Sequence, residues 1–142
     1  MKSTCTRSAV AVHILTVLAG SDGQAMTSAY IAASVNTNPV VIRRILAYLR
    51  KQKLVESKPG TGGGWKLTRD PKKITLREVY RAVETGPMLA IHHRANRRCM
   101  VGRCIKHTLA EVFAVAQSAM EESLAQTTIA AVWRDVQARA AA

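Results

Sequence analysis

The run Pro59-Gly60-Thr61-Gly62-Gly63-Gly64 constrains the fold more than any other segment. One proline and four glycines in six residues cannot continue a helix or a strand. The flanking residues 54–58 and 65–68 have the composition of short strands. The pattern predicts a β-hairpin with a glycine-rich tip. A phosphate-binding loop is the alternative, but the run lacks the Gly-Lys-Ser/Thr ending of a P-loop and no helical pattern follows it.

Two helical patterns precede this hairpin. Residues 27–35 predict a short helix, and residues 39–52 predict a second one that begins at Pro39, a residue well suited to the first helical position. The turn Asn36-Thr37-Asn38 separates them, and asparagine tolerates the left-handed conformation that tight turns use. Helix, turn, helix and hairpin in this order predict a winged helix-turn-helix.

The charge indicates what such a unit binds. The chain has 21 Lys and Arg against 9 Asp and Glu, a net charge of +12, which predicts a polyanionic partner, nucleic acid in preference to a membrane surface. Residues 1–75 hold 12 of these cations and 3 acids, whereas residues 76–142 hold 9 and 6. We therefore expect the N-terminal half to bind nucleic acid.

The N-terminal residues of the second helix are expected to meet base edges in the major groove. The alternative is that these charges only solvate an amphipathic helix. Six Lys and Arg against one acid between residues 43 and 58, followed by a wing, favour DNA binding. The predicted DNA-binding residues begin a helix, lie on the exposed side of the second helix or form the wing tip: Thr27, Ser28, Asn38, Pro39, Val40, Arg43, Arg44, Lys51, Lys58, Thr61, Gly62 and Gly63. We also expect Gly62, Gly63 and Gly64 to include residues at positive φ or in close approach to the DNA backbone.

The C-terminal half predicts a pairing region. Residues 3–19, 75–84 and 128–139 predict further helices, and residues 103–125 form the longest amphipathic pattern of the chain. One small domain cannot cover so long an apolar stripe, so we expect it to be buried against a second copy of the chain. The predicted dimerisation residues are Ile105, Leu109, Val112, Phe113 and Met120. The predicted division is a DNA-binding domain over 1–86, then a loop, the dimerisation helix and a C-terminal helix over 87–142.

Length and composition disfavour several other classes. A chain of 142 residues is the size of one domain, and three cysteines cannot form a complete intrachain disulfide set, which favours a reduced, cytoplasmic protein. The apolar stretch 9–20 loosely resembles a secretory signal, but His13 and Thr16 interrupt it and it is too short to span a bilayer. No nucleophilic triad, paired acids or nucleotide loop is apparent, so an enzyme is not expected.

Three segments carry a family resemblance: residues 34–44 around Asn-Thr-Asn-Pro-Val, residues 60–67 around the glycine run, and residues 74–84 after the wing. On these the chain resembles the Rrf-two family of bacterial winged helix-turn-helix regulators, which includes the IscR, NsrR and CymR repressors. It is most similar to the YwnA-type branch, with which it shares the segment Cys99-Met100-Val101-Gly102. The resemblance implies a mainly α fold with a small β-wing and a homodimer that pairs through the long C-terminal helix.

The cysteines allow two kinds of sensor chemistry. The resemblance implies that iron–sulfur members use three clustered cysteines before the dimer helix, whereas this chain has only Cys99 and Cys104 there. With His107 they form a Cys-x4-Cys-x2-His trio that leaves zinc or an iron–sulfur cluster open as the less favoured cofactor. A redox switch at Cys99 and Cys104 is the competing hypothesis, because neighbouring arginines favour the thiolate. All three cysteines being unreactive is also consistent with the sequence.

The sequence therefore predicts a DNA-binding transcriptional regulator, a homodimeric repressor that responds to redox state or to a ligand. The alternative is a DNA-associated protein that is controlled by a bound small molecule or protein partner, without thiol or metal sensing.

Overall fold

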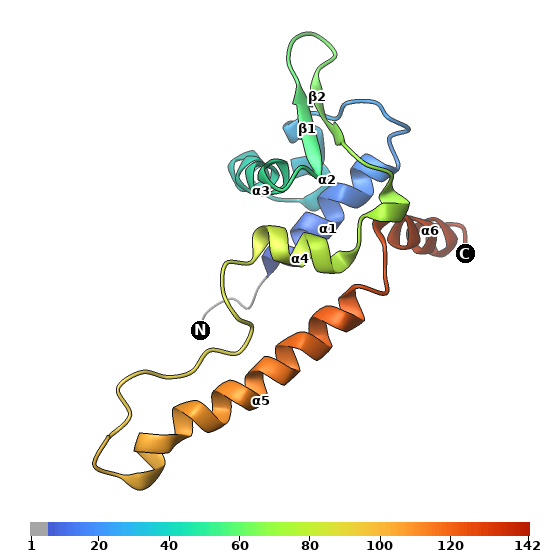
Figure 1. Ribbon diagram of the computed structural model, residues 1–142. Helices are drawn as coiled ribbons and strands as arrows, with labels where there is room; N and C mark the ends of the chain where they lie inside the picture. Colours follow the sequence, from blue (N-terminus) through green and yellow to red (C-terminus); the bar gives the residue numbers. More distant parts are fainter. Residues whose placement is uncertain (1–5) are drawn as a thin grey trace.

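The computed structural model describes residues 6–142 and consists mainly of helices around one two-stranded sheet (Figure 1). In chain order the elements are α1 (Thr6–Ala19), α2 (Ser28–Val35), α3 (Pro39–Lys51), β1 (Val55–Lys58), β2 (Gly64–Leu67), the 3₁₀ helix η1 (Pro71–Lys73), α4 (Leu76–Val83), α5 (Met100–Leu124) and α6 (Ile129–Ala140). This order confirms the predicted fold class, a winged helix-turn-helix followed by a long helix.

A single hydrophobic core holds the first part of the chain together. It is formed by α1, α2, α3, the start of β1, α4 and one residue of α6. Burying each large aliphatic side chain of this kind stabilises the fold by about 1.5 to 3 kcal/mol. The largest fully buried side chains are Ile14, Leu15, Ile31, Ile42, Leu46, Leu49, Leu54, Ile74, Ile129, Val55, Val79 and Val83.

The hairpin predicted from the glycine run is present. Strands β1 and β2 pair antiparallel from Val55 opposite Leu67 to Lys58 opposite Gly64. An ion pair between Lys66 Nζ and Glu56 Oε1 at 3.3 Å joins one cross-strand pair. The hairpin projects from the helical body as a wing (Figure 1).

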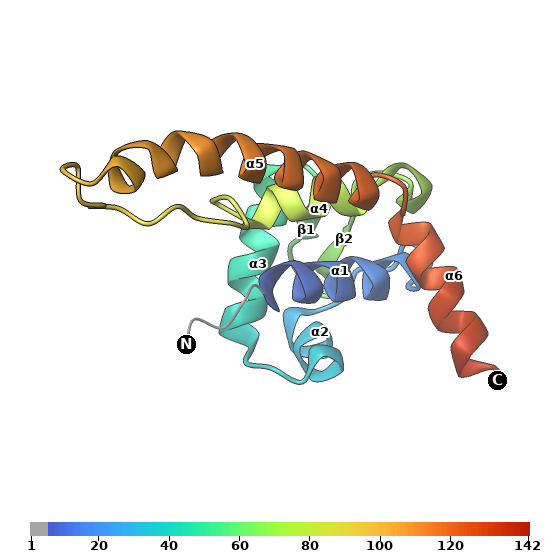
Figure 2. The same cartoon turned by 90° about the horizontal axis from the view of Figure 1, so that it is seen from below.

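Helix α5 lies outside the core. None of its residues is buried, and Figures 1 and 2 show it running along the body and extending beyond it, with its N-terminal end farthest out. It begins at Met100, three residues earlier than the predicted start at 103, because Cys99 takes the extended N-cap conformation. The irregular segment before it, residues 84–99, gave no period from which this start could be recognised.

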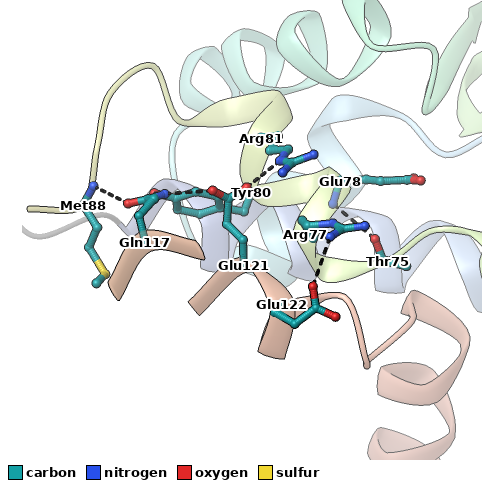
Figure 3. Close-up of polar contacts among 9 residues, drawn as sticks. All are labelled: Thr75, Arg77, Glu78, Tyr80, Arg81, Met88, Gln117, Glu121 and Glu122. Carbon is teal, nitrogen blue, oxygen red and sulfur yellow. Dashed lines mark hydrogen bonds and ion pairs between the residues drawn. The ribbon is translucent and has the colours of Figure 1, made fainter. Parts of the chain in front are cut away.

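A polar cluster fastens the C-terminal half of α5 to α4 (Figure 3). Arg81 pairs with Glu121, and Arg77 Nη1 lies 3.7 Å from Glu122 Oε2. Gln117 Nε2 donates to the Tyr80 hydroxyl and to Glu121 Oε2, each at 3.2 Å. Among the described residues, side-chain pairs to the helical body involve only this half of α5.

Helix α6 returns to the body. Ile129 is fully buried in the core, and its N–H donates to the Ile74 carbonyl at 2.9 Å. Thr128 caps the helix by accepting from the Ala131 N–H at 3.1 Å. The proposed boundary at residue 86 stays a prediction, and the packing of α6 shows that residues from both sides of it share one core.

Two predicted helix starts have different outcomes. The helix predicted from residue 75 begins as expected: Thr75 accepts from the Glu78 N–H at 3.3 Å and caps α4, while the Glu78 carboxylate pairs with Arg69. The start of the helix predicted over residues 3–19 lies outside the described residues.

Candidate nucleic-acid interface

Local hydrogen bonds set the turn between α2 and α3. Thr27 Oγ1 accepts from the Tyr30 N–H at 3.1 Å and begins α2. Asn36 ends that helix in the left-handed conformation, with φ 61° and ψ 52°. Asn38 Oδ1 then accepts from the Val40 N–H at 2.8 Å, and Pro39 opens α3. Both asparagines of the predicted turn thus have a backbone role, which fixes the angle at which α3 leaves α2.

Helix α3 buries one stripe and exposes the other side. Its buried residues are Ile42, Ile45, Leu46 and Leu49, whereas Val41 is exposed. The residues of the opposite face recur every three or four positions: Val40, Arg44, Ala47 and Lys51. All four are exposed, as are Asn38, Pro39 and Arg43.

The two predicted arginines lie on different sides of this face. Arg44 belongs to the exposed stripe and lines a hollow of about 270 Å³ with Arg7 and Tyr48, where α1 meets α3. Arg43 is one residue earlier and shares its side with Arg50, whose guanidinium lies 5.7 Å from the centre of the Trp65 ring on the wing. Arg43 therefore lies toward the wing and Arg44 toward α1.

The wing presents a second set of predicted residues. Lys58, Thr61 and Gly62 are exposed at and beside its tip. Gly62 has φ +73°, which confirms that the run includes residues in the left-handed region. A Cβ on Gly63 would lie 2.1 Å from the Lys58 carbonyl oxygen, so the close approach at this position is made by the hairpin itself.

Sequence reasoning missed the anchoring of the wing to the start of α2. Met26 and Trp65 exchange backbone hydrogen bonds of 2.9 and 2.8 Å, and Gly64 packs so closely that a Cβ would meet the Met26 oxygen at 2.5 Å. A hollow of about 300 Å³ beside this contact is lined by Gln24, Lys58 and Lys66. Backbone N–H groups and lysines around a shallow hollow are typical phosphate contacts.

A further exposed residue was missed on α2. Tyr30 is 56% exposed although it is aromatic, and it lies one turn after Thr27. Its predicted neighbours Thr27 and Ser28 are exposed and half-buried, respectively. The sequence shows a tyrosine at the start of α2. Its exposure could not be predicted, because it depends on which face of this short helix packs against the core.

Comparisons with known proteins decide the family. The family model described as "Rrf2: Iron-dependent Transcriptional regulator" matches residues 4–135. The chain belongs to the Rrf2 (Rrf-two) family. This confirms the resemblance and makes the Rrf2-family chain a DNA-binding transcriptional regulator rather than an enzyme.

Individual relatives agree with this. The chain is 43% identical over 125 residues to YwnA of Bacillus subtilis (strain 168), assigned as an HTH-type transcriptional regulator, covering 87% of this chain and 92% of YwnA. A crystal structure assigned to a DNA-binding protein has 40% identity and a TM-score of 0.72, covering 89% of this chain and 97% of the other. CymR, the global cysteine regulator of B. subtilis, shares the fold at 23% identity and a TM-score of 0.68, covering 94% and 98%.

The segment before α5 holds the predicted sensor residues. Cys99 and Cys104 are both exposed free thiols, and Cys99 is the N-cap of α5. The backbone N–H groups of Gly102 and then Val101 lower the pKa of the Cys99 thiol, which favours its thiolate. The structure thus supports thiolate chemistry at one of the two predicted cysteines.

Within the described residues, the same segment does not bring a set of metal ligands together. Across residues 6–142 no three His, Cys, Asp or Glu side chains gather as a ligand set, so Cys99, Cys104 and His107 are not assembled for one ion. Arg94, Arg97 and Arg103, which line a hollow here, would oppose a cation. Among the helices described, none has the length and apolar character needed to cross a membrane.

Proposed function

We propose that this Rrf2-family protein is a cytoplasmic homodimeric repressor that reads a twofold-symmetric DNA operator. In this proposal α3 enters the major groove, the wing contacts the adjoining backbone and α5 pairs the two copies. The observation that supports it most directly is that α5, a helix of 25 residues, has no buried residue. When a long, partly apolar helix is not covered by its own chain, its apolar side chains are expected to be buried against a second copy of the chain.

The exposed side of α5 supplies the pairing surface. Val112 is 57% exposed and Val115 is 71% exposed, and Val101 shares their side at helical spacing. Of the predicted dimerisation residues Val112 is thus the most open, whereas Ile105, Leu109, Phe113 and Met120 are half-buried by their own chain. We propose that the valine side forms the first contact and that Leu109 and Met120 complete the interface, whereas Ile105 and Phe113 line hollows between α5 and the loop before it.

Pairing explains how a small protein selects one site. Two recognition helices related by a twofold axis require two inverted half-sites separated by whole helical turns, about 34 to 36 Å or its multiples. Occupying an operator needs only the DNA-binding body and the pairing helix. The DNA-binding body supplies the base and backbone contacts, and the pairing helix sets the separation of the two copies.

A charge reversal on α5 tests this proposal. Val112→Glu with Val115→Glu places four carboxylates in the twofold interface without partners, which strongly opposes pairing. We expect analytical ultracentrifugation to show a monomer, with loss of operator binding by fluorescence anisotropy. The matched control, Val136→Glu with Ala138→Glu, adds the same charges to exposed positions of α6 and should leave a dimer. A dimeric α5 variant would place the interface elsewhere.

Thiol sensing is the second part of the proposal, and the lowered pKa of Cys99 favours it. Cys99 caps α5, so a change at its sulfur acts on the end of the pairing helix. We propose that oxidation at Cys99 and Cys104 lowers operator affinity. Oxidant should then weaken DNA binding by the parent chain and not by the Cys99→Ser, Cys104→Ser variant. An equal response of both proteins would remove this pair of cysteines from the sensing mechanism.

A further inference from the structure

The outer end of α5 and the segment before it enclose a basic hollow of about 380 Å³, a volume within the range of small-molecule sites. Its lining is dominated by cations and histidines, among them Arg94, Arg97, Arg103, Lys106 and His107. Figure 1 shows this end of α5 at the opposite side of the molecule from the wing. The hollow is therefore separate from the candidate DNA-binding face.

The charge of this region is not balanced by the chain. No acidic residue occurs between Glu84 and Glu111, a stretch that contains five Lys and Arg and three His. At the other end of α5, by contrast, Arg77 and Arg81 are paired with carboxylates (Figure 3). Within the part of the chain that the structure describes, none of the cations lining the hollow has an ion-pair partner. Like charges held together repel, so an anion that enters is stabilised by several of them at once.

The hollow is built rigidly. Asn96 Oδ1 accepts from the Arg98 N–H at 3.0 Å, and the Asn96 carbonyl accepts from the Cys99 N–H at 3.2 Å. The same carbonyl oxygen would lie 2.2 Å from a Cβ at Gly102, so only glycine lets the loop pack on the first turn of α5. Arg94 has φ +67°, which turns the loop back over the helix. The backbone that carries these cations is thus set before a ligand arrives.

An apolar cavity adjoins the basic hollow. It has a volume of about 540 Å³, and His93 and Lys106 line both. The apolar side chains around it come from the loop and from α5, among them Leu89, Ile91 and Phe113. A basic hollow and an apolar cavity that share two residues match a molecule with an acidic group at one end and an apolar body at the other.

We propose that this composite site binds a small anion, a carboxylate or phosphate ester, that carries an apolar group. The acidic group lies among Arg94, Arg103 and Lys106, and the apolar body lies against Phe113 and Ala110. Charge complementarity favours an anion over a metal cation, and the distance of the hollow from the wing separates the site from operator binding. The inference concerns ligand binding without DNA, so it stands or fails independently of the proposed repressor function.

Calorimetric titration of the DNA-free protein with phenylphosphate, inorganic phosphate and phenol tests the site. Phenylphosphate is expected to bind about tenfold more tightly than inorganic phosphate, because only its ring buries apolar surface. Phenol, which lacks the anion, should give no measurable binding. Equal affinities for the two phosphates, or no binding of either, would overturn the proposal.

A matched pair of triple variants tests whether the acidic group binds in the basic hollow. Arg94→Gln, Arg103→Gln and Lys106→Gln together should weaken phenylphosphate by about tenfold or more, since each charged hydrogen bond is lost. The control, Lys72→Gln, Lys73→Gln and Arg134→Gln, removes the same charge from exposed positions elsewhere and should bind as the parent does. If the triple variant is too unstable to measure, Lys106→Gln alone should also weaken the binding of phenylphosphate. Equal loss in both triple variants would show nonspecific charge attraction and overturn the site.

Filling the apolar cavity tests the apolar part of the proposed site. Ala110→Leu should weaken phenylphosphate and leave inorganic phosphate unchanged, because the added side chain occupies only the space of the ring. Ala138→Leu on the exposed side of α6 is the matched control. Unchanged phenylphosphate binding by Ala110→Leu would place the ring outside this cavity and contradict the proposal.

Discussion

At the scale of single residues, Arg44 is the most informative position of the DNA-binding face. It lies on the exposed stripe of α3, in line with Val40 and Lys51, and is exposed. If Arg44 reads a base, Arg44→Ala should cost about 1 to 3 kcal/mol of binding free energy and relax preference at one position. Fluorescence anisotropy with operator duplexes that differ at single positions measures both effects. Arg134→Ala on α6 is the control.

The same titrations separate a base contact from a phosphate contact. If Arg44 meets only phosphate, all sequences weaken alike and the slope of log affinity against log salt falls by about one unit. Arg43, on the side of the wing, is expected to follow this second pattern. Unchanged DNA binding by the double variant Arg43→Ala, Arg44→Ala would remove α3 from the role of recognition helix.

Cys99 makes a prediction about pH. Because nearby backbone N–H groups lower the pKa of its thiol, the reactive thiolate persists at pH values below the ordinary midpoint of about 8.5 for cysteine. The rate of iodoacetamide alkylation at Cys99, followed by peptide mass spectrometry from pH 6 to 10, should reach half its maximum below that midpoint. A midpoint at or above that of a free cysteine peptide would contradict a stabilised thiolate.

At the scale of elements, the contact between α4 and α5 is sensitive to acid. The hydrogen bond from Arg81, then that from Gln117, lowers the pKa of Glu121, whose side chain is 16% exposed. A carboxylate with a depressed pKa in the folded state stabilises the fold above the ordinary glutamate value of about 4.3, and this contribution is lost as pH falls through the depressed value.

Glu121→Gln tests this contribution. The parent chain should be more stable than the variant near neutral pH, and the difference should shrink as pH falls below about 4.3, where Glu121 takes up a proton. Thermal unfolding followed by circular dichroism over pH 3 to 7 measures it. Glu111→Gln, at an exposed position of α5, is the matched control. A difference that does not vary with pH would mean that the carboxylate charge does not stabilise this contact.

At the scale of the whole molecule, the local features were predictable and the assembled ones were not. The turn at Asn36, the cap at Asn38 and the glycine tip of the wing follow from backbone preferences of single residues, so the sequence is sufficient for them. The attachment of Met26 to Trp65 and the burial of Ile129 join residues far apart in the chain. No periodicity within either segment contains that information.

In the candidate site, too, some features could be predicted from the sequence and others required the folded chain. The exposed residues of α3 and the wing were identified from charge and helical spacing. For Gly63 the sequence predicted close approach to DNA. The folded hairpin shows that the backbone it approaches is that of its own chain. The basic hollow needed the loop to turn back over α5, which depends on Arg94 at positive φ and on the contact of Gly102 with Asn96.

Selection of binding sites from a random duplex library tests the central claim, that two copies of this chain read DNA together through α3. The account predicts that the purified protein enriches one motif with two inverted half-sites, their centres separated by a whole number of helical turns, about 34 to 36 Å each. Enrichment of a single unrepeated motif, or of no motif at all, would contradict it.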